Sequence, residues 1–130
     1  MEKEIGVVRV ILEREGKILI LKRAIGSTGG GKFCLPGGLI DKGMTAEETC
    51  VKEVKEETDL NVLKSKFLFK KIGKVEHGKK YIHNYFYATF SGDVKINEES
   101  SDYAWIDVKD MKKHDFAFED DKAIEQYLSS

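Results

Sequence analysis

The chain has little proline and little cysteine, with Pro36 as its only proline and Cys34 and Cys50 as its two cysteines. A single proline excludes a proline-rich linker or recognition segment. The two cysteines do not have the spacing of a metal or redox motif, and nothing indicates a disulfide framework. Two buried thiols in a reducing compartment are therefore favoured, and we expect a cytoplasmic protein.

Long apolar runs and an excess of charge are also missing. No segment approaches 18 uninterrupted apolar residues, and the first residues carry acids without an apolar run behind them, so neither a membrane span nor a secretion signal is expected. The 22 basic and 23 acidic residues give a net charge of −1, which provides no reason for nonspecific binding to nucleic acid or membranes. We expect a small-molecule ligand and either a monomer or a homodimer.

The residues that are present predict one folded domain over residues 1–130. Apolar residues make up 41% of the 130-residue chain, which is enough for a hydrophobic core. The pattern predicts strands before a glycine-rich turn at Gly37 and Gly38, a central helix, two further strands and a closing helix. The first strands are expected at 7–13, 18–21 and 33–35, and the central helix at 45–58. The two further strands are expected at 60–72, with a turn near 64–65, and at 81–90. The last helix is expected at 120–128.

The central helix is predicted to begin at Thr45, because Thr45 and Glu48 have the spacing of a capping box. Its apolar stripe contains Glu57, and a carboxylate at such a position is costly unless it is paired or binds a metal ion. Glu53, Glu56 and Glu57 stand at i, i+3 and i+4, so their side chains project close together. A divalent cation such as Mg²⁺ or Mn²⁺ would relieve their repulsion. The alternative is a solvated acidic face paired with neighbouring lysines.

The stretch from Gly38 to Leu60 resembles the Nudix box, G-x5-E-x7-R-E-U-x-E-E-x-G-U, in which U is a bulky aliphatic residue. The positions that match, in register and without gaps, are Gly38, Glu53, Val54, Glu56, Glu57 and Leu60. Three positions depart from the pattern. Met44 replaces a glutamate, Lys52 replaces an arginine, and Asp59 replaces a glycine, so we expect an assembled site that is less firmly held.

This resemblance implies a fold, a cofactor and a site. The fold would be an α/β/α sandwich, a mixed β-sheet with helices on both sides. The cofactor would be Mg²⁺, with Mn²⁺ as an alternative. The implied metal ligands are the Gly37 carbonyl and the carboxylates Glu53, Glu56, Glu57 and Glu99. The general base would be Glu53 or Glu99. Glu98 is a neighbouring candidate for the role of Glu99, and a solvated acidic loop remains the other interpretation.

The candidate substrate-binding residues are Arg23, Gly38, Lys52 and His83. Arg23 ends the second strand, where the family often has an arginine facing the substrate phosphates. His83 lies on one face of the aromatic strand 81–90, where a nucleobase could stack, although an ordinary sheet surface would have the same pattern. Lys52 keeps the positive charge of the family's arginine and would orient the acidic cluster.

The implied reaction is hydrolysis of a nucleoside diphosphate linked to another group. Because Pro36 is the only proline, the downstream proline of the ADP-ribose and NADH branches cannot be present. The tyrosine of the dinucleoside-polyphosphate branch and the coenzyme A motif are also missing. This elimination favours a nucleoside triphosphate, cleaved to monophosphate and pyrophosphate. The alternative is a nucleotide-binding or regulatory module with weak or no turnover.

Overall fold

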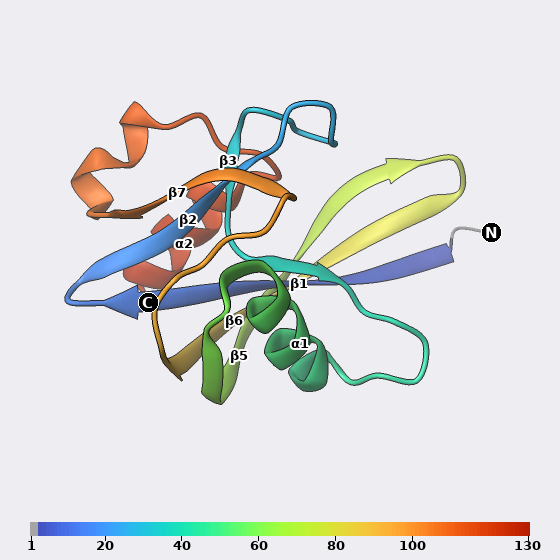
Figure 1. Cartoon of the computed structure of the whole chain (residues 1–130). Coiled ribbons are helices and arrows are strands. Elements are labelled where there is room, and N and C mark those ends of the chain that lie inside the picture. Colours follow the sequence, from blue (N-terminus) through green and yellow to red (C-terminus); the bar gives the residue numbers. More distant parts are fainter. Residues whose placement is uncertain (1–2) are drawn as a thin grey trace.

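The computed structural model describes residues 3–130, and Figure 1 shows a mixed sheet with helices on both sides. The strands and helices have the following bounds: β1 Lys3–Arg14, β2 Lys17–Arg23, β3 Phe33–Cys34, β4 Gly37–Leu39, α1 Ala46–Thr58, β5 Asn61–Glu76, β6 Lys79–Ser91, β7 Ser100–Ile106, the 3-10 helix η1 Val108–Lys113 and α2 Asp120–Leu128. The predicted fold class is confirmed.

Strand β1 forms the centre of the sheet. The strand order is β3-β2-β1-β6-β5, with β4 paired to β1 and β7 paired to β2. The β1–β6 pair is parallel and the remaining pairs are antiparallel, so the sheet is mixed. β1 therefore contacts both the strands that precede α1 and the long β5–β6 hairpin that follows it.

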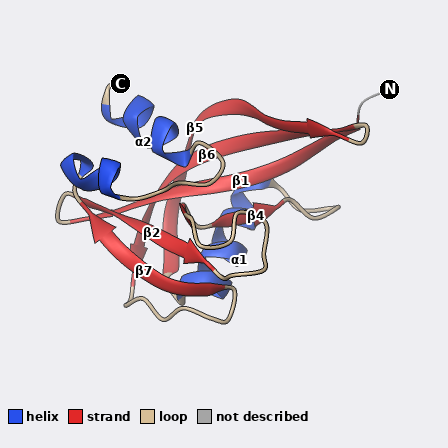
Figure 2. Cartoon of the chain, turned by 90° about the horizontal axis from the view of Figure 1, so that it is seen from above, coloured by secondary structure: helices blue, strands red, loops and turns tan. Residues whose placement is uncertain are grey.

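The two faces of β1 belong to two separate apolar clusters, because successive side chains of a strand point to opposite faces. Val8, Val10 and Leu12 are fully buried in a cluster that contains Cys50 and Val54 of α1. Ile11, on the other face, is buried in a cluster with residues of α2. Figure 2 shows α1 and α2 on opposite sides of the sheet, as this alternation requires.

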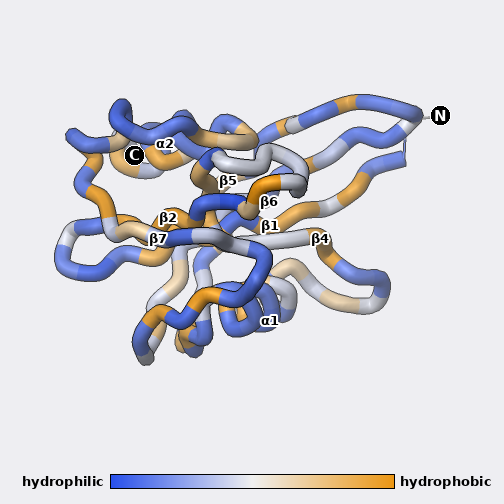
Figure 3. Tube along the Cα trace, turned by 45° about the horizontal axis from the view of Figure 1, so that its top comes forward, coloured by the Kyte–Doolittle hydropathy of each residue, from blue (hydrophilic) through white to orange (hydrophobic). Residues whose placement is uncertain are grey.

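Helix α1 begins where the capping box predicts. Thr45 is the N-cap, its side chain accepts from the backbone N–H of Glu48, and the Glu48 carboxylate accepts from the backbone N–H of Thr45. The helix ends at Thr58, and Asp59 adopts a left-handed conformation with φ of 65°. In Figure 3 the trace of α1 alternates between hydrophilic and hydrophobic residues, in keeping with one buried face.

Two local predictions are wrong. The turn expected near residues 64–65 is absent, because β5 continues from Asn61 to Glu76 and absorbs the irregular pattern as register shifts against β6. The turn expected at Gly37 and Gly38 is instead strand β4, in which both glycines pair with β1. Among the helices of residues 3–130, none combines the length and apolar character that crossing a bilayer requires.

Candidate active site

A cavity of about 450 Å³ lies between α1, the end of β2 and the loop that precedes β7. We call it the acidic cavity, because five carboxylates line it. Its lining residues are Arg23, Ala24, Ser27, Cys34, Gly37, Glu53, Glu56, Glu57, Glu98, Glu99 and Ser100. The three glutamates of α1 therefore line the same cavity as Glu98 and Glu99 of the loop before β7.

Gly37 and Gly38 allow β4 to pass close to both β1 and α1 (Figure 2). A Cβ atom at Gly37 would overlap the carbonyl oxygen of Val8, and one at Gly38 would overlap the carboxylate of Glu53. The backbone N–H of Gly37 donates a hydrogen bond to Oε2 of Glu57 at 3.2 Å. Glycine is required at Gly37, where a side chain would collide with the backbone of β1, whereas a side chain at Gly38 would displace the Glu53 carboxylate.

Burial and the crowding of carboxylates raise two pKa values. Burial, followed by the charge of Glu53, raises the pKa of Glu57 to about 8, although Arg9 and the Gly37 hydrogen bond oppose the change. Burial, followed by the charge of Glu56, raises the pKa of Glu53 to about 7, and Lys52 opposes this change. Perturbed carboxylates in a cavity are typical of functional sites. The nearby charges of Arg9 and Lys52 only partly offset these shifts.

The donor set of the acidic cavity fits a hard divalent cation, since it consists of carboxylate oxygens. Within residues 3–130, however, no three acidic, histidine or cysteine side chains already lie close enough to form a metal-binding group. Glu53 and Glu56 are near enough to interact through a side-chain hydrogen bond, and Glu53 and Glu99 both act on Glu57 through their charge. Glu53, Glu56 and Glu57 are the residues that would hold Mg²⁺ or Mn²⁺.

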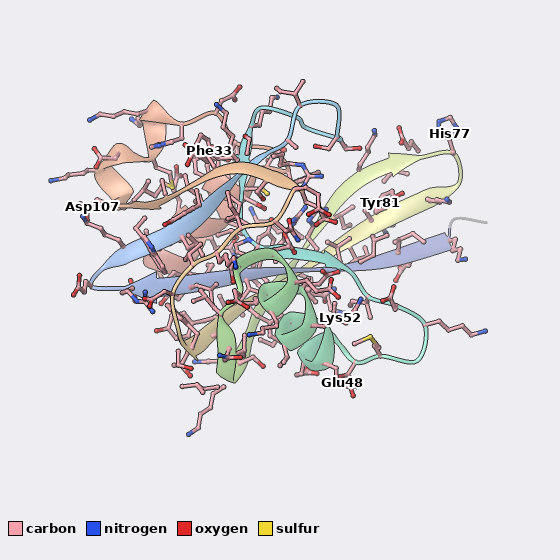
Figure 4. All side chains as sticks on the ribbon, in the orientation of Figure 1. Phe33, Glu48, Lys52, His77, Tyr81 and Asp107 are labelled. Atoms are coloured by element: carbon pink, nitrogen blue, oxygen red, sulfur yellow. The ribbon has the colours of Figure 1, made fainter. Side chains whose placement is uncertain are left out.

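Lys52 has a partner that the sequence analysis missed. Its Nζ lies 2.9 Å from Oδ2 of Asp41 and 3.9 Å from Oε1 of Glu56, and the Asp41 hydrogen bond is the main cause of a raised Lys52 pKa. Asp41 thus supplies the acidic partner that Met44 does not. Lys52 projects from α1 beside Glu48 in Figure 4, and it lines neither the acidic cavity nor the second cavity described next.

A second cavity, of about 860 Å³, adjoins the acidic cavity, and Arg23 lines both. We call it the large cavity. Its lining residues are Val7, Arg9, Arg23, Thr28, Leu39, Lys71, Ile72, Gly73, Lys74, Glu76, Tyr81, His83, Tyr85, Phe118 and Glu119. The ring of Phe118 contacts two guanidinium groups, with its centroid 4.2 Å from Cζ of Arg9 and 4.9 Å from Cζ of Arg23.

The structure brings most of the sequence-predicted residues to these two cavities. Gly37, Glu53, Glu56, Glu57 and Glu99 line the acidic cavity, and Glu98 lies beside them. Among the predicted substrate contacts, Arg23 lines both cavities, His83 lines the large one, and Gly38 packs against Glu53. Gly38 and Lys52 line neither cavity, and Lys52 contacts Glu56 and Asp41 from outside.

Several residues of the large cavity were not found from the sequence. Arg9 is only 5% exposed although it stands within an otherwise apolar run of β1, and that interruption was the available signal. Phe118 and Glu119 belong to no periodic pattern in the sequence. In the structure both adopt left-handed conformations, with φ of 59° and 57°, in the segment before α2.

Comparison with known proteins identifies the class to which this fold and these cavities belong. A sequence model of the NUDIX domain matches residues 2–127, and the chain belongs to the Nudix family.

Two curated relatives and one solved structure are among the proteins that the chain resembles. It is 31% identical to the ADP-ribose pyrophosphatase of Methanocaldococcus jannaschii over 121 residues, which cover 91% of this chain and 69% of that protein. It is 23% identical to the CTP pyrophosphohydrolase of Escherichia coli over 127 residues, or 98% and 93% of the two chains. The solution structure of the E. coli ORF135 protein superposes with a TM-score of 0.86 at 22% identity, covering 98% and 91%. Family membership and these relatives make the chain a diphosphate hydrolase.

Proposed function

We propose that this protein hydrolyses nucleoside triphosphates to nucleoside monophosphate and pyrophosphate, and that it requires Mg²⁺, for which Mn²⁺ can substitute. The observation that carries the proposal is the junction of two cavities at Arg23. The acidic cavity is suited to a metal-bound phosphate chain, and the large cavity, at about 860 Å³, has the size of a site for a small organic ligand. Arg23 at the junction would contact phosphate oxygens.

The carboxylates of α1 would divide the work of the acidic cavity. Glu56 and Glu57 would hold the metal ion, together with the carbonyl of Gly37. A bound divalent cation polarises the phosphorus centre and helps to ionise a water molecule. Glu53 or Glu99 would orient and deprotonate that water, and the pKa of about 7 at Glu53 suits a base that works near neutral pH.

Lys52 would act from outside the cavity. Its contact with Glu56, and its hydrogen bond to Asp41, restrict the position that Glu56 can take. A supporting contact of this kind typically changes affinity or activity by about 10–100-fold.

The test is product analysis on a panel of nucleotides with and without Mg²⁺ or Mn²⁺. We expect pyrophosphate and a nucleoside monophosphate from at least one triphosphate, and no product in a metal chelator. A Glu57→Gln variant provides the control for contaminating phosphatases. Release of inorganic phosphate without pyrophosphate, or turnover that does not depend on metal, would contradict the proposal.

ADP-ribose is the second candidate substrate, favoured by the 31% identity to an ADP-ribose pyrophosphatase. The same two cavities would accept it, since the diphosphate would still lie over the acidic cavity. The products distinguish the two candidates, because ADP-ribose gives AMP and ribose 5-phosphate without pyrophosphate. A higher kcat/KM for ADP-ribose than for every triphosphate would replace our first choice.

A nucleotide-binding module with weak turnover is the alternative from another class of function. The complete set of carboxylates in the acidic cavity argues against it. Nucleotide binding without product on any substrate would establish it. We further propose that the protein acts in the cytoplasm as a monomer or homodimer, without a nucleic-acid or membrane partner.

A further inference from the structure

Two polar side chains stand on a face of the sheet that is otherwise part of the core. β1 and β6 pair in parallel with Val7 opposite His83 and Arg9 opposite Tyr85, so these four side chains share one face. Further along the same face Ile11 is fully buried in the apolar cluster beneath α2. Arg9 and His83 therefore replace core positions of β1 and β6, and both line the large cavity.

Both side chains carry a buried atom without a partner. Arg9 is 5% exposed and His83 is 6% exposed. Within residues 3–130, Nε of Arg9 and Nδ1 of His83 have no hydrogen-bond partner. Buried polar atoms in native proteins are nearly always paired, so each exception calls for an explanation. Nε of Arg9 faces Asp120, so a ligand in the large cavity would meet the other guanidinium N–H groups of Arg9 and the ring of His83, both of which line the cavity.

The guanidinium of Arg9 is held in a fixed position before any ligand arrives. Its Nη1 donates to the carbonyl oxygen of Leu35 at 3.3 Å, its Nε lies 4.0 Å from Oδ2 of Asp120, and its Cζ lies over Phe118. Asp120 is itself fixed by hydrogen bonds from the Leu35 N–H and the Tyr85 hydroxyl. Arginine offers only donors, so the group that it can bind is an acceptor.

His83 is neutral at physiological pH, because burial, followed by the charge of Arg9, lowers its pKa to about 4. A neutral imidazole carries one N–H, which can donate to the same acceptor or to its neighbour. Gly73 sets the position of this ring, since a Cβ atom at Gly73 would lie 2.5 Å from Nε2 of His83. The register shift between Ile72 and Val75 places this glycine against the histidine.

We propose that Arg9 and His83 determine base specificity, and that they select a nucleobase with a ring carbonyl, a pyrimidine or guanine, over adenine. This inference rests on the proposed function for the presence of a nucleotide. A ring carbonyl presents two lone pairs to the donors of Arg9 and His83. Adenine has no carbonyl, and its exocyclic amine would turn hydrogens toward the guanidinium. A site built to hydrogen-bond a group discriminates strongly against an analogue that lacks it.

The test is binding of nucleoside monophosphates to the full-length, metal-free protein, measured by calorimetry with CMP, UMP, GMP and AMP. We expect at least one of the carbonyl-bearing nucleotides to bind about tenfold or more tightly than AMP. His83→Phe removes the imidazole donor and should bring that ratio close to one. His114→Phe is the matched control, because His114 lines neither cavity, and it should leave the ratio unchanged.

Gly73→Ala tests the position of the histidine without removing it. The added methyl group should displace His83, lower the preference against AMP, and raise KM for the preferred triphosphate with little change in kcat. Arg9→Met tests the second donor and should also lower the preference against AMP, with circular dichroism to verify its folding. If the Arg9→Met protein does not fold, the result for His83→Phe decides whether the two residues set base specificity.

Equal binding of AMP and the carbonyl-bearing nucleotides would overturn the inference, as would an unchanged ratio in the His83→Phe protein. The outcome is separable from that of the proposed function. Base discrimination without hydrolysis contradicts only the proposed function, and hydrolysis without discrimination contradicts only the specificity role of Arg9 and His83.

Discussion

Glu57 occupies a position on α1 where an apolar residue would pack with less cost. It is 8% exposed, it stands among the buried residues of the helix, and within residues 3–130 its carboxylate accepts a hydrogen bond only from the backbone N–H of Gly37. Burying a carboxylate without a cation is unfavourable, and the raised pKa is the measure of that penalty. At the residue scale, function and stability therefore oppose each other at this position.

Glu57→Gln should remove activity while it stabilises the metal-free protein. The amide keeps the size and the acceptor for the Gly37 N–H, but it is a poor metal ligand. We expect a loss of kcat/KM larger than the 10–100-fold typical of supporting contacts. Product release in saturating Mg²⁺ measures the first effect, and urea unfolding at pH 8 in a chelator measures the second. Retention of more than about a tenth of the activity would contradict the role of Glu57 as a ligand.

The metal-free protein should lose stability as the pH rises. The Glu57 and Glu53 pKa values lie at about 8 and about 7 in the folded state, above the ordinary value of 4.5. A raised carboxyl pKa favours folding below the unfolded pKa, and this contribution disappears as the pH rises through the folded value. We expect the Tm in a chelator to fall between about pH 6.5 and pH 9, above the range in which the lowered pKa of His83 acts in the opposite direction.

Two comparisons separate this effect from other titrations. The fall in Tm should be smaller in Glu57→Gln, which does not titrate at this position. It should also be smaller in saturating Mg²⁺, because a bound cation favours the charged carboxylates. A Tm that stays constant or rises over this range in the chelator would contradict the interpretation.

At the scale of single elements, the loop between β4 and α1 does more than cap the helix. Thr45 and Glu48 fix where α1 begins, and Asp41 fixes Lys52 further along the helix. The family's pattern predicts a glutamate at position 44, and in this chain the acidic partner of Lys52 comes instead from position 41. The support of the acidic cluster is thus relocated within the same loop.

Asp41→Ala should lower kcat/KM by about 10-fold, within the range for loss of a supporting contact, because Lys52 is then free to leave Glu56. The global free energy of unfolding should change little, since both partners are exposed to solvent that screens their charges. Steady-state kinetics and urea titration measure the two effects.

Met44→Glu in the Asp41→Ala background provides the matched test. A glutamate at position 44 should restore part of the activity by giving Lys52 a new partner, whereas in the wild-type background it should have little effect. Equal gains in both backgrounds would show that Asp41 does not support Lys52.

The parts of the fold that the sequence predicts are those decided by local rules. The capping box gives the start of α1, and alternation gives β1 and β6, because neighbours along the chain determine both. Arg9 could not be assigned, since its partners Leu35, Asp120 and Phe118 come from distant segments. The role of Asp41 could not be predicted either, because its contact with Lys52 depends on how the loop folds back onto α1.

At the scale of the whole molecule, β5 is an exposed edge of the sheet. Unpaired strand edges can pair with another chain, and lysines commonly prevent this. Lys64, Lys66 and Lys70 of β5 are exposed, as are the apolar Leu63 and Phe67 on the same strand. The lysines therefore protect an edge that would otherwise favour association.

Replacing Lys64, Lys66 and Lys70 together by threonine should increase self-association. Threonine favours strands and removes the repulsion between two edges. Sedimentation velocity over a range of concentrations should show a larger weight-average mass than the wild type. The triple arginine variant keeps the charge and should sediment like the wild type, and an unchanged mass in the threonine variant would contradict this role of the lysines.

Strand β1 takes part in both cavities, with its backbone at one and its side chains at the other. Its backbone, through the carbonyl of Val8, meets Gly37 at the wall of the acidic cavity, whereas its side chains at Val7 and Arg9 line the large cavity. Substituting the side chains of β1 and β6 that line the large cavity can thus change ligand choice while the main chain beside the acidic cavity stays in register. A scaffold of this kind can diversify its substrates by point mutation without rebuilding its reaction machinery.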